Sequence, residues 1–159
     1  MKFLSNFSNR ELNLWATLVL DVGVTVYYFS QVLGMPGGLD ANLVELAKLV
    51  GKIIIFAIIF GIIVFSIINA RGQEQLDERD YRFEAKANSI GHGTLVICAV
   101  LIIGHIVLNT LGLNYWPSNQ KFLLSVSPMA IAHLLLLALI LTSSVKAISQ
   151  LILYRRDMV

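Results

Sequence analysis

Residues 53–68 read IIIFAIIFGIIVFSII, a run without a single charged side chain. Together with its flanks, from Lys48 to Asn69, this stretch is long enough to cross the roughly 30 Å hydrocarbon core of a bilayer as an α-helix. Soluble domains carry about 25% charged residues, whereas this chain carries 14%, with 57% hydrophobic residues and a mean hydropathy of +0.75. The stretch therefore predicts a membrane span in a membrane protein.

Three further runs of similar length predict three more spans, at residues 12–33, 88–111 and 128–154. Gly34 and Pro36 end the first run, and Pro128 after a serine-containing stretch is a typical helix start. No remaining segment reaches the roughly 50 residues of a separate soluble domain. We therefore expect one domain over residues 1–159, an all-α integral membrane four-helix bundle.

The basic residues predict the orientation of the spans. Near the span ends, one side of the membrane receives Lys2, Arg10, Arg71, Arg79, Arg82, Lys86, Arg155 and Arg156, and the other receives Lys48, Lys52 and Lys121. The positive-inside rule then places both termini and the central loop in the cytoplasm.

The central segment from Arg71 to Lys86 is predicted to be helical and to extend the third span into the cytoplasm. Glu78 lies four residues before Arg82, and no proline follows Gly72, which favours a helix. Its charged residues form a solvated face or a docking surface for a partner or for lipid headgroups. The residues of this cytoplasmic motif are Asp77, Glu78, Arg79, Asp80, Glu84 and Lys86.

Asp21 is the most informative ionisable residue, because a charge at the bilayer centre costs about 2.5 to 3.5 kcal/mol on insertion scales. At helical spacing it belongs to a polar stripe that also contains Asn13, Thr17, Thr25 and Tyr28. Such a stripe must face other helices or water. Two arrangements are open: an ion pair between Asp21 and Lys146, or a Lys146 that reaches the surface and leaves a protonated Asp21 bonded to Thr17 or Thr25.

His105 and His133 are predicted to lie at one level in the outer half of the bundle, near Tyr27 and Tyr28. Imidazoles and phenols at this depth could relay a proton, or they could form ordinary hydrogen bonds between helices. A metal site is not expected, because no third histidine, Glu-x-x-His motif or cysteine pair completes a ligand set. Cys98 is the single cysteine, which excludes quinone oxidoreductases that need paired thiols.

Two short motifs resemble small uncharacterised bacterial four-helix membrane proteins. The first is the Asp77-Glu78-Arg79-Asp80 run, followed by Glu84 and Lys86-Ala87 before a glycine-containing span; the second is Glu11 with Trp15 at the start of the first span. The resemblance implies a location in the bacterial inner membrane. It implies no assigned reaction and therefore no catalytic residue.

These observations favour a non-enzymatic structural, regulatory or interaction protein. The alternative is a small proton-coupled transporter or channel subunit in which Asp21 binds the proton, with Lys146 or the His105 and His133 level completing the path. We expect no cofactor and no nucleic-acid partner. The expected partners are membrane lipid, another copy of the chain, or a cytoplasmic or membrane protein.

Overall fold

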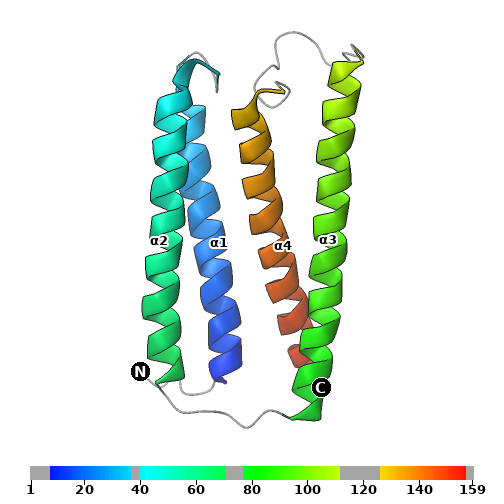
Figure 1. The fold of residues 1–159 in the computed structure, drawn as a ribbon. Coiled ribbons are helices and arrows are strands. Elements are labelled where there is room, and N and C mark those ends of the chain that lie inside the picture. The colour runs from blue at the N-terminus through cyan, green and yellow to red at the C-terminus, as the bar shows by residue number, and fades with distance from the viewer. Residues whose placement is uncertain (1–7, 37–39, 71–76, 112–125, 157–159) are drawn as a thin grey trace.

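The computed structural model describes residues 8–36, 40–70, 77–111 and 126–156, and all the long elements in them are helices (Figure 1). They are α1 (Asn9–Leu33), α2 (Leu43–Asn69), α3 (Glu78–Thr110) and α4 (Pro128–Arg156), with a short 3-10 turn η2 (Asp40–Asn42) before α2. Each of the four is long and apolar enough to cross a membrane. The prediction of an all-α protein with four helices of membrane-spanning length is confirmed, and these helices suggest a multi-pass membrane protein.

The helices extend beyond the predicted spans. α2 begins at Leu43 rather than Lys48, and α1 begins at Asn9 rather than residue 12. Apart from the buried Leu46, the added residues of α2 are exposed, and Glu45 among them forms an ion pair with Lys48, with Nζ and Oε1 3.0 Å apart. An apolar run predicts only the part of a helix that would lie in hydrocarbon. The polar turns that continue the same helix beyond the run are not predicted by it.

Reciprocal side-chain caps fix the starts of α1 and α3. The Ser8 hydroxyl accepts from the Glu11 backbone N–H at 3.1 Å, and the Ser8 N–H donates to the Glu11 carboxylate at 3.4 Å. Asp77 and Asp80 form the same arrangement ahead of α3. Such capping boxes satisfy backbone N–H groups that the first helical turn leaves without partners. The predicted extension of the third span is therefore helical from Glu78 onward.

The helices pack in the spatial order α2, α1, α4, α3 (Figure 1). α1 packs against α2 and α4, and α4 also packs against α3, whereas α2 and α3 stand at opposite ends of this order. The chain is therefore two helical hairpins, α1/α2 and α3/α4, joined mainly through α1 and α4. Of the four helices, α2 has the smallest buried share in its most apolar stretch.

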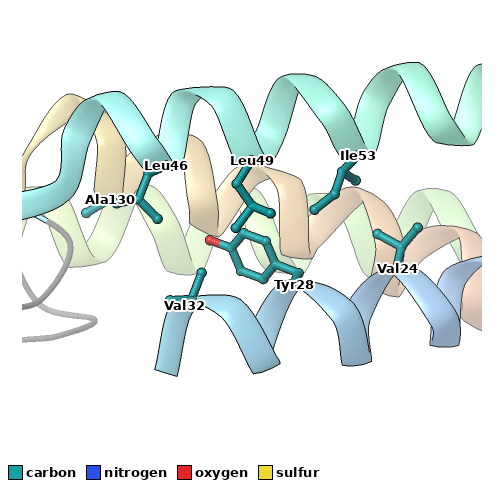
Figure 2. Close-up of a cluster of buried hydrophobic side chains, with 7 residues drawn as sticks. All are labelled: Val24, Tyr28, Val32, Leu46, Leu49, Ile53 and Ala130. Atoms are coloured by element: carbon teal, nitrogen blue, oxygen red, sulfur yellow. The ribbon is translucent and has the colours of Figure 1, made fainter. Parts of the chain in front are cut away.

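An apolar cluster joins α1 to α2 near the end of the molecule where α1 finishes and α2 starts. Val24, Tyr28 and Val32 of α1 recur at helical spacing and meet Leu46, Leu49 and Ile53 of α2, with Ala130 of α4 beside them. Figure 2 shows the Tyr28 ring lying beneath Leu49, between the two helices. Leu46 is completely buried. Side-chain shape rather than polar bonding therefore positions α2.

A glycine allows the closest approach between α3 and α4. Gly91 is buried, and a Cβ added to it would lie 3.2 Å from the Lys146 Cβ and 3.7 Å from the Thr142 carbonyl oxygen. Small residues at helix interfaces let backbones approach in this way. Lys146 is thus positioned by its stem against α3.

A large residue at position 91 should separate α3 from α4. We expect Gly91→Leu to lower the free energy of unfolding by about 1–3 kcal/mol, the usual cost of overpacking. SDS titration of the protein in mixed micelles, followed by circular dichroism, measures the change. Gly93→Leu is the matched control, because a Cβ at Gly93 meets nothing within 4 Å. Equal stability of the two variants would contradict the close approach.

Basic residues gather at one end of the molecule, where α1 and α3 begin and α2 and α4 end (Figure 1). The described members of this set are Arg10, Arg79, Arg82, Lys86, Arg155 and Arg156. Lys48 and Lys52 belong to the half of α2 nearer the other end, while Lys2, Arg71 and Lys121 lie outside the described residues. This is the asymmetry on which the predicted orientation depends.

Candidate functional site

Asp21 lies in the contact between α1 and α4, which we call the α1–α4 seam. Only 8% of Asp21 is exposed, although the residue sits in the middle of an apolar helix. Its carboxylate accepts a hydrogen bond from the Ser144 hydroxyl of α4 at 3.0 Å, and the Ser143 hydroxyl is a second donor. The acid of the predicted stripe therefore faces a neighbouring helix and is buried from the outer surface of the bundle.

Lys146 does not neutralise Asp21. Among the described residues no ion pair joins the two, and the partners of the carboxylate are serine hydroxyls. Of the two predicted arrangements, the Asp21–Lys146 ion pair is wrong, because the Lys146 stem is held against Gly91 of α3, on the side of α4 away from α1. Thr17 and Thr25 do not bond the Asp21 carboxylate; their hydroxyls donate to the backbone carbonyls of Asn13 and Asp21.

Tyr28 and His133 form the second polar contact of the seam. Each residue is 2% exposed. The Tyr28 hydroxyl and His133 Nδ1 share a hydrogen bond, and the two ring centroids are 5.3 Å apart. His133 Nε2 is buried and has no partner in the described part of the chain. Tyr28 lies seven residues after Asp21, so the two contacts are separated by about 10.5 Å along the helix axis.

The predicted group of two histidines and two tyrosines forms only in part. Tyr28 and His133 meet, but Tyr27 is 48% exposed on another face of α1. His105 belongs to α3, and no hydrogen bond or ring contact that the structure describes joins it to this pair; its Nε2 is buried without a partner there. No three His, Cys, Asp or Glu side chains of the described ranges gather closely enough to hold a metal ion.

Removing the Tyr28 hydroxyl should destabilise the seam. In Tyr28→Phe, His133 Nδ1 loses its partner while remaining buried, which typically costs about 1–3 kcal/mol. We expect a fall of that size in the free energy of unfolding, measured by SDS titration. Tyr27→Phe removes the same atom from an exposed ring and should leave stability unchanged. Equal effects of the two substitutions would show that the Tyr28–His133 bond contributes nothing.

A third polar cluster, the Arg10 latch, joins three helices at the basic end of the molecule. Arg10 Nη1 of α1 donates to the Tyr154 hydroxyl of α4 at 3.0 Å and lies 3.3 Å from Asp80 Oδ1 of α3. Arg10 Nη2 lies 3.5 Å from Glu84 Oε2, also on α3. The Tyr154 hydroxyl donates to Asp80 at 3.0 Å, and its ring packs edge-on against Phe83.

The surroundings of Asp80 favour its ionised form. Partial burial raises the pKa of the Asp80 carboxyl, but hydrogen bonds from the Asp77 backbone N–H and the Tyr154 hydroxyl, with the charge of Arg10, lower that pKa below its usual range overall. An acid whose pKa is lower in the folded than in the unfolded state contributes stability above its unfolded pKa. That contribution disappears as the pH falls through the folded pKa.

The contribution of the latch should therefore depend on pH. We expect Arg10→Gln to lower the free energy of unfolding by about 1–3 kcal/mol at neutral pH, the range for hydrogen bonds to charged groups. The difference from wild type should shrink as the pH falls below about 4, the pKa of an unperturbed Asp, and should disappear only below the lower pKa that Asp80 has in the folded protein. Unfolding curves across pH measure it. Glu45→Gln, which breaks an exposed ion pair, should change little; a pH-independent Arg10→Gln effect would contradict the role of Asp80.

The cytoplasmic motif divides into inward and outward members. Asp80 and Glu84 contact Arg10, whereas Asp77, Glu78, Arg79 and Lys86 are exposed. Part of this motif therefore holds the helices together. The sequence does not predict this role, because Arg10 and Asp80 are far apart along the chain and only the packing of the helices brings them to a common level.

Ser144 and Gln150 are further residues that complete the polar contacts of α4. Ser144 bonds Asp21, and Gln150 is 6% exposed and bonds Tyr154. The signal in the sequence was the pair Ser143-Ser144 inside an apolar run, at a depth that matches Asp21 in an antiparallel helix.

No protein-family model, curated protein or solved structure matches the chain. The polar contacts of the α1–α4 seam are the observations that bear on its function.

Proposed function

We propose that the chain is a non-enzymatic regulatory membrane protein in which proton binding at Asp21 sets the strength of the contact between its two helical hairpins. The observation that carries the proposal is the position of Asp21: 8% exposed, within an apolar helix, and bonded to serine hydroxyls without a cation in the described structure. An ionised carboxylate in such surroundings is costly unless it is paired.

Protonation of Asp21 would act on the whole molecule because of where the acid lies. α1 and α4 provide the principal contact between the hairpins. A neutral Asp21 carboxyl fits the seam, whereas an ionised one favours the entry of water and a looser contact. The two charge states of one side chain therefore correspond to two strengths of the hairpin contact.

The location that we propose is the bacterial inner membrane, with both termini in the cytoplasm. The clustering of basic residues at the end where α1 begins and α4 finishes supports this orientation. The resemblance of the Asp77–Asp80 run to small bacterial membrane proteins supports the location. The outward members of the cytoplasmic motif remain accessible to a partner protein on that side.

The proposal predicts a pH-dependent distance between the hairpins. Spin labels on Val19Cys and Ile152Cys of a Cys98→Ala protein place one probe on α1 and one on α4, both at exposed positions. Electron paramagnetic resonance in nanodiscs should show the distance increasing as the pH is raised from about 4 to about 9, a range that brackets perturbed carboxyl pKa values. An unchanged distance over the whole range would refute the proposal.

Asp21→Asn is the control that assigns any such change to this carboxyl. The amide oxygen can accept from Ser144 as the carboxylate does, so the variant should fold and keep the short distance at every pH. A variant that still responds to pH as wild type does would place the response elsewhere, for example at His133.

Asp21→Leu, which leaves the serine hydroxyls without an acceptor, should instead lower the free energy of unfolding by about 1–3 kcal/mol.

A proton-coupled transporter or channel subunit is the second candidate, and a specific observation favours it. Besides Asp21, the molecule contains buried polar atoms without partners among the described residues: Asn13 Oδ1, Thr142 Oγ1, His105 Nε2 and His133 Nε2. Buried polar atoms of this kind bind water when there is room. A line of such waters beside Asp21 and the Tyr28–His133 pair would carry protons.

Proton flux into proteoliposomes under an imposed pH gradient and membrane potential separates the two candidates. Under the transporter or channel candidate, wild type conducts protons above empty vesicles and Asp21→Asn does not. Under the regulatory proposal, neither protein exceeds empty vesicles, although the label distance still responds to pH. Folding of both proteins is checked by circular dichroism before reconstitution.

A further inference from the structure

An apolar groove of about 720 Å³ runs along the contact of α1 and α4 near the basic end of the molecule. We call it the Trp15–Arg155 groove. Its α1 wall includes Trp15 and Val22, and its α4 wall includes Ile152 and Arg155. It is separate from the polar contacts of Asp21 and Tyr28, neither of which lines it.

The groove is open to the surroundings of the protein rather than filled by its own side chains. Val22 is 59% exposed and Ile152 is 52% exposed. In a protein that crosses a membrane, such a surface faces acyl chains. Trp15 is 41% exposed in the second turn of α1, the depth at which tryptophan sits at the boundary between headgroups and hydrocarbon.

Charge distinguishes this groove from an ordinary lipid-facing surface. Arg155, in the last turn of α4, lines its mouth, and no carboxylate of the described residues forms an ion pair with it. A guanidinium offers several donors in a geometry that suits phosphate. An apolar channel whose arginine has no ion-pair partner among the described residues, and lies at the membrane-surface end, matches a molecule that has an acyl chain and an anionic headgroup.

We infer that the Trp15–Arg155 groove binds one anionic phospholipid, with its phosphate on Arg155 and an acyl chain along Val22 and Ile152. Basic pockets between membrane helices recognise anionic lipid headgroups by the same chemistry. A lipid held there touches both α1 and α4 and so covers one face of the α1–α4 seam. The inference does not depend on proton binding at Asp21.

Fluorescence quenching by brominated lipids tests this inference directly. In a Trp116→Phe protein all tryptophan fluorescence comes from Trp15, because the chain has two tryptophans. Phosphatidylglycerol with brominated acyl chains should quench Trp15 at about a fivefold lower mole fraction than brominated phosphatidylcholine does, the ratio expected for one basic residue near an anionic lipid.

Two pairs of variants locate the site. Arg155→Gln should abolish the preference for phosphatidylglycerol, whereas Arg156→Gln, the same loss of charge at a neighbour that does not line the groove, should keep it. Val22→Phe fills the groove and should weaken quenching by phosphatidylglycerol. Val26→Phe, one turn further along α1 at a similarly exposed position, should not. All four positions are exposed, and circular dichroism checks the fold.

Three results would overturn the inference. Equal quenching by both lipids would indicate an unselective lipid shell. An equal loss of preference in Arg155→Gln and Arg156→Gln would indicate general attraction to a charged surface. Protection of Trp15 from both lipids, with Val22→Phe restoring access, would indicate that a second copy of the chain covers the groove.

Discussion

Hydrocarbon offers no hydrogen-bond partners, so a polar side chain within a membrane helix bonds either to the backbone of its own helix, as Thr17 and Thr25 do, or to a neighbouring helix. In this chain α1 and α4 carry the polar groups that match. Ser144 bonds Asp21, and His133 bonds Tyr28, with the Arg10–Tyr154 contact at the end of the same pair of helices. These contacts fix the register of α1 against α4, and the other helices take their places around that pair.

α2 and α3 join the central pair by different means. α2 is positioned by Leu46, Leu49 and Ile53, which pack against Tyr28 of α1 (Figure 2). α3 approaches α4 closely at Gly91, and its Asp80 and Glu84 form ion pairs with Arg10 of α1. Close approach at a glycine and ion pairs with Arg10 thus position α3, whereas the packing of apolar side chains positions α2.

The sequence was sufficient to predict four membrane-length helices, because apolar runs of that length have no other common use. It also predicted that Asp21 faces a helix, since a polar stripe cannot face lipid. It did not decide the partner of Asp21. Depth along the axis suggested Lys146, but depth does not say which side of a helix a residue occupies, and Lys146 faces α3. The Arg10 latch was not predicted either. Its members come from three separate helices, and the sequence does not say which sides of those helices face one another.

The order α2, α1, α4, α3 divides the helix contacts into those between neighbouring segments of the chain and those between distant ones. Contacts within each hairpin join neighbouring segments and form quickly, whereas the contact of α1 with α4 joins residues more than a hundred positions apart, such as Tyr28 and His133. In a bilayer, which the length and composition of the four helices allow them to cross, each hairpin would insert as a unit, and the polar faces of α1 and α4 would meet only once α4 is in place. Before α4 is in place Asp21 would lack the Ser144 hydroxyl that bonds its carboxylate, so the burial of this acid in α1 depends on a helix more than a hundred residues away.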